Sequence, residues 1–252
     1  MVIAVLNSKG GVGKTATAVG LAAALAAPRR RILLVDLDSQ ACASHWCGVS
    51  RNQLRPSAAS VLFEKYPMLK AIRHTPAPYL DLLTGSLELA NADLALADVR
   101  GREVALRRVL ERVVPLYDLI VLDCPPGLSL LGINAILAAD GLLVPVSAEP
   151  LAADALEGLL ASVERVRSRM QPAAGLLGIV LTQVDPRRPL TRETAERLRA
   201  EHRDHVFHTE LRWTAALAAA PGARRPPAPT DAFRRLGGEV LHRLAAARHE
   251  RA

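Results

Sequence analysis

The chain has 252 residues, of which 50% are hydrophobic, 23% are charged and 3% are aromatic. This composition excludes disordered and fibrous proteins, and no apolar run approaches the ~20 residues that a membrane-spanning helix needs. The formal net charge is +7, and residues 187–252 hold 14 arginines against 8 acidic residues, an excess of +6 that favours a nucleic acid, an anionic membrane surface or a solvated arginine-rich face. The first residues carry no basic leader, so we expect a cytoplasmic protein.

Short apolar segments alternate with helical patterns along the chain. Strands without polar alternation are typical of a parallel sheet covered on both faces, so we expect an α/β fold with a mostly parallel, twisted sheet and helices on both faces. No repeat or linker divides the chain, which predicts one domain over residues 1–252. The predicted strands are 2–6, 31–35, 119–123, 141–146 and 176–182; the predicted helices are 15–27, 103–116, 151–170, 191–205 and a last one from about 231; residues 48–80 are expected to form short helices and turns, and 220–230 a surface loop.

A glycine-rich loop joins the first predicted strand to the first predicted helix. Glycines let backbone N–H groups turn toward a phosphate, and the helix N-terminus adds its positive dipole end. Lys14 is placed to reach the β- and γ-phosphates, and the Thr15 hydroxyl to ligate Mg²⁺. The loop departs from the strict GxxxxGK[ST] pattern, because Ser8 stands at the first glycine position and Lys9 follows it. The predicted nucleotide-binding residues are Gly10, Gly11, Val12, Gly13, Lys14, Thr15 and Ala16.

Acidic residues follow two of the other buried strands. Asp36 and Asp123 each end a strand that flanks the loop, where carboxylates are expected to hold Mg²⁺ through water. Asp38 lies two residues further on and can reach the γ-phosphate side. At the end of a later strand, Thr182 and Asp185 are candidates for the base pocket, and an ordinary strand terminus explains them equally well.

The segment KGGVGKT at 9–15 resembles the deviant Walker A motif of the ParA/MinD ATPases, with Lys9 at the position of the family's signature lysine. The resemblance continues through ILLVDLDSQ at 32–40, DCPPGLSLLGINAI at 123–136, VPVSAEPLA at 144–152 and FRRLGGEVLHRL at 233–244, so it covers essentially the whole chain. The NSKGG, DCPP and AEPLA segments are more similar to the ParA (Soj) partition branch than to MinD. The chain begins at the first strand, without the N-terminal DNA-reading extension of longer plasmid members, so operator binding is not expected.

The resemblance implies a P-loop ATPase that uses ATP and Mg²⁺ and forms an ATP sandwich homodimer. It also implies nonspecific binding to double-stranded DNA on the nucleoid, and release when a centromere-binding (ParB-like) partner stimulates hydrolysis. Lys9 would reach the partner's phosphates and Asp38 would position the attacking water, so Lys9, Lys14 and Asp38 are the catalytic candidates. The resemblance places the family's DNA-contacting basic residues in the C-terminal region, where the candidates are Arg188, Arg192, Arg199, Arg203, Arg212, Arg224, Arg225, Arg234 and Arg235.

Two other functions fit the same fold. A MinD-like membrane-cycling or cargo-positioning ATPase would need a C-terminal amphipathic anchor. An apolar stripe exists in the last helix, but such a stripe more often packs on the sheet, and Gly237 and Gly238 each weaken the helix by about 1 kcal/mol, so we expect no membrane binding. A ligase or electron-transfer reductase lacks support, because the three cysteines do not suit an iron–sulfur bridge and no further acid–base cluster is evident. The stripe consists of Phe233, Leu236, Val240, Leu241 and Leu244.

Overall fold

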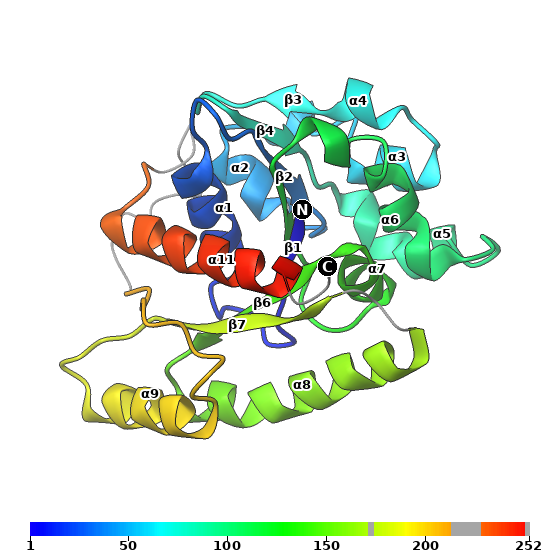
Figure 1. Cartoon of the computed structure of the whole chain (residues 1–252). Helices are drawn as coiled ribbons and strands as arrows, with labels where there is room; N and C mark the ends of the chain where they lie inside the picture. The colour runs from blue at the N-terminus through cyan, green and yellow to red at the C-terminus, as the bar shows by residue number, and fades with distance from the viewer. Residues whose placement is uncertain (171–173, 213–227, 250–252) are drawn as a thin grey trace.

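The computed structural model describes residues 1–170, 174–212 and 228–249 (Figure 1). In this part of the chain a seven-stranded sheet has the order β3-β4-β2-β5-β1-β6-β7, and only β3 is antiparallel to its neighbour. The predicted α/β class with a mostly parallel sheet is therefore confirmed. The strands are β1 Val2–Val5, β2 Ile32–Asp36, β3 Arg73–His74, β4 Leu80–Leu83, β5 Leu119–Asp123, β6 Gly141–Ser147 and β7 Gly175–Thr182.

Helices cover both faces of the sheet because alternate residues of each buried strand point to opposite sides. In β1, Ile3 and Val5 join one apolar core, and Val2 and Ala4 join the other. The first core is closed by α1 (Lys14–Leu25), α2 (Cys42–Trp46) and α11 (Asp231–His249). The second is closed by α3 (Ala58–Phe63), α4 (Met68–Ala71), α5 (Ala92–Ala95), α6 (Ala105–Leu110), α7 (Leu130–Ala138), α8 (Pro150–Met170) and α9 (Pro189–Glu201).

The sheet topology positions a ligand site. Along the sheet, the connection from β1 to β2 runs toward the β3 edge, and the connection from β5 to β6 runs toward the β7 edge. Where connections diverge in this way, a crevice forms at the carboxyl ends of the strands. The glycine-rich loop after β1 and the acids that end β2 and β5 all lie at this edge.

Some predicted elements differ from the structure. The predicted helix 103–116 is instead the 3₁₀ turn η3 (Arg102–Val104), α6 and the 3₁₀ turn η4 (Val114–Leu116), because Pro115 cannot donate the hydrogen bond that a continuous helix needs. The predicted helix 191–205 ends at Glu201, after which the chain turns and runs beside β7. Neither β4 nor α7 is among the predicted elements, and most of the expected loop 220–230 lies outside the described residues.

The final helix begins at Asp231 as predicted and packs on α1 (Figure 1). The predicted apolar stripe faces inward, with Phe233, Leu236, Val240 and Leu244 buried. Gly237 allows α11 to approach α1 closely, because a Cβ at this position would lie 2.8 Å from Leu25 Cδ2. Among the described helices, none has the length and apolar character needed to cross a membrane.

Candidate functional site

A cavity of about 400 Å³ opens at the carboxyl edge of the sheet. The glycine-rich loop and the first turn of α1 form its floor, and Asp38, Trp46 and Phe233 form parts of its walls. Gly11 and Gly13 have φ values of 76° and 85°, a left-handed conformation that favours glycine and that turns the loop into the start of α1. The geometry is therefore that of a phosphate-binding loop in front of a helix N-terminus.

Lys14 begins α1, and its ammonium folds back over the loop. The side chain is buried, and Nζ donates to the Lys9 carbonyl oxygen at 3.0 Å. Burial lowers the pKa of Lys14, while the negative charges of Asp123 and Asp38 act in the opposite direction. Because an ammonium has three donors, it can bind phosphate oxygens in addition to this carbonyl.

Lys9 is oriented differently from Lys14. Its Nζ lies 3.6 Å from Glu149 Oε2 in the segment before α8, and its side chain is 32% exposed. The backbone of Lys9 is fixed by the Asn7 side chain, which accepts from Lys9 N at 2.9 Å and donates to the Pro145 carbonyl at 2.7 Å. The two lysines of the loop thus occupy its inner and outer sides.

Asp36 and Asp123 lie side by side, as partners in the register of β2 and β5. Both are fully buried, and the Asp123 carboxylate oxygens have no hydrogen-bond partner within the described ranges. Burial, followed by the charge of Asp36, raises the pKa of Asp123; the Thr15 hydroxyl lowers it. Burial also raises the pKa of Asp36, to about 6.

This donor set fits a divalent cation. Two adjacent buried carboxylates repel each other, and a hard cation would relieve that repulsion. No group of three or more His, Cys, Asp or Glu side chains suited to a metal occurs in the described part of the chain. A cation here would therefore need the Thr15 hydroxyl, water and phosphate oxygens beside Asp36 and Asp123.

Ser44 was not foreseen from the sequence, and it holds Asp36 in place. Its N and Oγ both donate to Asp36 Oδ2, at 2.8 and 2.6 Å. Asp38 N donates to the other oxygen of Asp36 at 3.1 Å, and Asp38 itself lines the cavity. Only the folded arrangement of α2 beside β2 brings this serine to the acid.

The end of β7 supports the phosphate loop. Thr182 Oγ1 donates to the Val12 carbonyl at 2.8 Å, and Gln183 Nε2 donates to the Gly11 carbonyl at 2.6 Å. Thr182 and Gln183 therefore line the cavity and hold the loop at the same time. Asp185, the second base-pocket candidate, lines a separate open pocket and accepts from Arg187 Nε at 2.9 Å.

Trp46 and Phe233 are the aromatic side chains in the lining of the cavity described here. Neither was predicted, because Trp46 lies in a short helix without a recognisable motif and Phe233 comes from the far end of the chain. Phe233 packs against Gly20 of α1, where any Cβ would overlap the ring. No local sequence signal identifies these positions.

The seven candidate arginines that the structure describes fall into three groups. Arg199 is partly exposed but already occupied, since its guanidinium donates to the Phe207 and His208 carbonyls and pairs with Glu210 at 3.0 Å. Three others form surface ion pairs: Arg188 with Asp185, Arg192 with Glu196, and Arg234 with Asp231. Arg203, Arg212 and Arg235 are exposed, and Arg224 and Arg225 lie outside the described residues.

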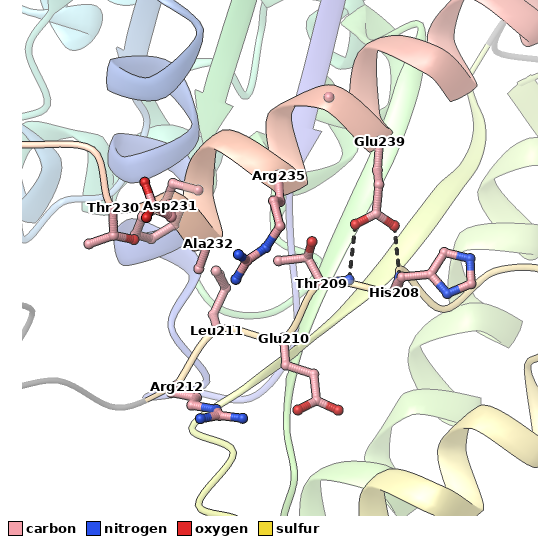
Figure 2. Close-up of a pocket in the computed structure, with 12 residues that line it drawn as sticks. His208, Thr209, Glu210, Leu211, Arg212, Thr230, Asp231, Ala232, Arg235 and Glu239 are labelled. Carbon is pink, nitrogen blue, oxygen red and sulfur yellow. Dashed lines mark hydrogen bonds between the residues drawn. The ribbon is translucent and has the colours of Figure 1, made fainter.

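An open pocket of about 930 Å³ lies between the start of α11 and the segment beside β7 (Figure 2). Arg212 and Arg235 come to it from these two elements. Glu239 fixes the segment by accepting from the backbone N–H groups of His208 and Thr209, at 2.7 and 2.9 Å. This pocket adjoins the cavity of about 400 Å³ at the phosphate-binding loop, with which it shares Leu211, Arg212 and Phe233.

Known proteins resemble the whole chain. A family model described as an AAA domain matches residues 1–174. The chromosome-partitioning ATPase Soj of Thermus thermophilus is 40% identical over 252 residues, covering 97% of each chain. The sporulation initiation inhibitor protein Soj of Bacillus subtilis is 36% identical over 244 residues, covering 97% of this chain and 96% of its own. The chain belongs to the Soj/ParA branch of the ParA/MinD ATPases. Among solved structures, one described as cobyrinic acid a,c-diamide synthase from Mycobacterium smegmatis, with bound ADP and magnesium, matches this ParA-family chain at a TM-score of 0.84 and 31% identity, covering 97% of this chain and 95% of the other.

Proposed function

We propose that this chain is a DNA partition ATPase. It binds ATP with Mg²⁺, forms a sandwich homodimer around two nucleotides, and in that state binds double-stranded DNA nonspecifically. ATP hydrolysis, stimulated by a centromere-binding protein, then releases the chain from the DNA. The carrying observation is the cavity lined by Lys14, the phosphate loop and Asp38, with the adjacent buried carboxylates of Asp36 and Asp123 at the ends of β2 and β5. The chromosome-partitioning name of the Thermus relative supports the rest.

The proposed hydrolysis depends on positioning and charge. Loop N–H groups and Lys14 hold the phosphates, and Thr15, Asp36 and Asp123 hold the cation, the carboxylates through water. Once bound, Mg²⁺ neutralises phosphate charge. Asp38, at the cavity wall, orients the attacking water.

The dimer is supported by the position of Lys9. Its ammonium lies on the outer side of the loop, beside the exposed Glu149 carboxylate, so a second copy approaching this edge would meet it. A lysine reaching the partner's phosphates makes each nucleotide part of the interface. Dimerisation then depends on which nucleotide is bound.

The DNA surface is proposed to centre on Arg203, Arg212 and Arg235, together with Arg224 and Arg225. Arg188, Arg192 and Arg234 can contribute only after exchanging their acidic partners for phosphates. We leave Arg199 out of this set because its donors already bind carbonyls and Glu210.

The test is co-sedimentation with random duplex DNA and with anionic liposomes, in ATP and in ADP. We expect DNA binding with ATP only and no binding to liposomes. Asp38→Ala should still bind ATP and Mg²⁺, hydrolyse ATP roughly 100-fold more slowly and remain on DNA, because phosphoryl transfer depends on the positioned water. Equal DNA binding in both nucleotides, or wild-type turnover by Asp38→Ala, would contradict the proposal.

The membrane and ligase alternatives are less well supported. The apolar stripe that a membrane anchor would need is buried against α1. An amide-forming activity, suggested by the name of the mycobacterial structure, would need a nitrogen donor, and releasing ammonia from an amide donor calls for a nucleophile such as a reactive thiolate. Burial and the charges of Asp38, Asp36 and Asp123 instead raise the pKa of Cys42, the cysteine that lines the cavity.

A further inference from the structure

A buried hydroxyl links the end of β4 to the acid that ends β2. Gly85 N lies 3.0 Å from Ser44 Oγ, which lies 2.6 Å from Asp36 Oδ2. A peptide N–H can only donate, so Ser44 Oγ accepts from Gly85 and gives its own hydrogen to the ionised Asp36 carboxylate. The hydrogen bonds therefore run in one direction, from Gly85 through Ser44 to Asp36.

Gly85 also has a steric role in this arrangement. A Cβ at this position would lie 2.6 Å from the Asp38 carbonyl oxygen and 2.8 Å from Asp36 Cγ and Oδ1. Backbone and carboxylate atoms are fixed here, so a side chain would push the two acids away. The absence of a side chain at Gly85 therefore lets the segment after β4 pack directly against the Asp38 backbone and the Asp36 carboxylate.

The result is a carboxylate held from both sides. Asp36 Oδ2 accepts two hydrogen bonds from Ser44, and Oδ1 accepts one from Asp38 N. The neighbouring Asp123 carboxylate makes no such short hydrogen bond with the described residues, and the Thr15 hydroxyl, a candidate ligand of the cation, is the side-chain donor that acts on it. Asp36 therefore has a fixed orientation that the protein itself supplies, whereas Asp123 is left to a ligand.

We propose that Ser44 and Gly85 are positioning residues that fix Asp36, and through it Asp38, for the Mg²⁺–nucleotide complex. This inference rests on the proposed function, because it presumes that Mg²⁺ and nucleotide bind here. Ser44 lies in α2 between Cys42 and Trp46, both of which line the cavity. The same short helix therefore supports the acid and borders the nucleotide.

The test compares ADP affinity in Mg²⁺ with ADP affinity in EDTA. In the wild type, Mg²⁺ is expected to strengthen ADP binding. In Ser44→Ala, this Mg²⁺-dependent gain in ADP affinity should fall by ~10–100-fold, because the lost hydrogen bond orients a ligand of the metal. The ADP affinity in EDTA should stay unchanged. Ser44→Thr, which keeps the hydroxyl, should restore the gain. Ser60→Ala is the matched control, because Ser60 of α3 is also buried but its Oγ accepts from Ser57 N rather than donating to Asp36.

The outcomes separate the two proposals. If Mg²⁺ does not strengthen ADP binding in the wild type, the proposed function fails and this inference with it. If the wild type responds and Ser44→Ala responds equally, or Ser60→Ala loses as much, only the positioning role is overturned.

A second measurement covers the case in which Ser44→Ala does not fold. In the wild-type ADP complex, adding Mg²⁺ should slow hydrogen exchange at the Gly85 amide, because the cation tightens the acid that this amide supports. An unchanged exchange rate at Gly85 would overturn the inference.

Discussion

The two lysines of the phosphate loop differ in environment although only five positions separate them. Lys14 is buried and donates into its own loop, and Lys9 is partly exposed beside Glu149. A buried ammonium can bind only a ligand in its own chain's cavity, whereas an ammonium at the rim can also contact a ligand bound to a neighbouring molecule. The two positions should therefore fail in different ways when mutated.

We expect Lys14→Ala to abolish ATP binding, because it removes the cation that lies over the loop. Lys9→Ala should bind nucleotide as a monomer and no longer dimerise with ATP. Nucleotide titration followed by light scattering separates these effects. A Lys9→Ala protein that still forms ATP-dependent dimers would remove the role across the interface.

Asp81 is a buried carboxylate in β4, next to the edge strand β3 and away from the site. It accepts hydrogen bonds from Arg31, His74 and the Tyr117 hydroxyl, at 3.0, 2.6 and 2.8 Å. Burial alone would raise the pKa of Asp81, but these hydrogen bonds outweigh it and hold that pKa below its usual value. A group of this kind stabilises the folded state at pH values above its unfolded pKa.

The stabilisation from Asp81 should therefore be complete above about pH 4, and it should decline as the pH falls through the lower folded-state pKa. Asp81→Asn is expected to cost about 1–3 kcal/mol at pH 7 and to flatten the acid side of the stability profile. Urea unfolding between about pH 3 and 7 measures this. Asp98→Asn, at an exposed acid, is the control, and an equal cost at both positions would contradict the assignment.

Helices α1 and α11 connect the nucleotide cavity with the C-terminal region. Phe233 of α11 fits against Gly20 of α1 and also lines the cavity. Alanine is normally favoured over glycine inside a helix by about 1 kcal/mol. At Gly20 the contact with Phe233 should reverse that preference.

Gly20→Ala is expected to destabilise the fold by about 1–3 kcal/mol, because the new Cβ overlaps the Phe233 ring, and it should also weaken ADP binding. Gly238→Ala, where a Cβ meets no atom within 4 Å, should stabilise by up to about 1 kcal/mol. Thermal unfolding of both variants checks the pair. A stabilised Gly20→Ala protein would show that Phe233 can move away at little cost.

Local patterns explain which elements could be predicted. The apolar runs of β1, β2 and β5, and the loop before Lys14, carry their signals within a few residues. Strand β4 escapes prediction because Asp81 interrupts its apolar run, and that charge is satisfied by partners from distant segments. In the site, the loop and the acids are visible in the sequence. Ser44, Gly85 and Phe233 are not, because their roles depend on contacts across the sheet.

The proposed DNA surface is a property of the whole molecule, because its arginines come from separate elements of the fold. Arg203, Arg212 and Arg235 are exposed and form no ion pair with another described residue. A monomer offering three phosphate contacts should bind DNA weakly. A dimer doubles the number of contacts without a change within either copy.

With ATP, we expect log affinity for DNA to fall with log salt with a slope near −5, from about six neutralised phosphates, and with little sequence preference. The slope should become shallower in Arg203→Glu and, separately, in Arg235→Glu. Arg29→Glu, at an exposed arginine beyond the end of α1, serves as the charge-matched control. Binding titrations at several salt concentrations give these slopes. A slope near zero would show that these arginines do not bind DNA phosphates.

Both edges of the sheet are closed to further strands. At one edge, β3 is only two residues long and antiparallel. At the other, the chain after α9 runs along β7, where Phe207 N donates to the Ile179 carbonyl and Leu211 N to the Leu181 carbonyl. An exposed edge is a template on which copies anneal irreversibly through their backbones. In the proposed dimer, two copies of this protein would therefore meet through side chains, loops and the shared nucleotide, which are contacts that one round of hydrolysis can undo.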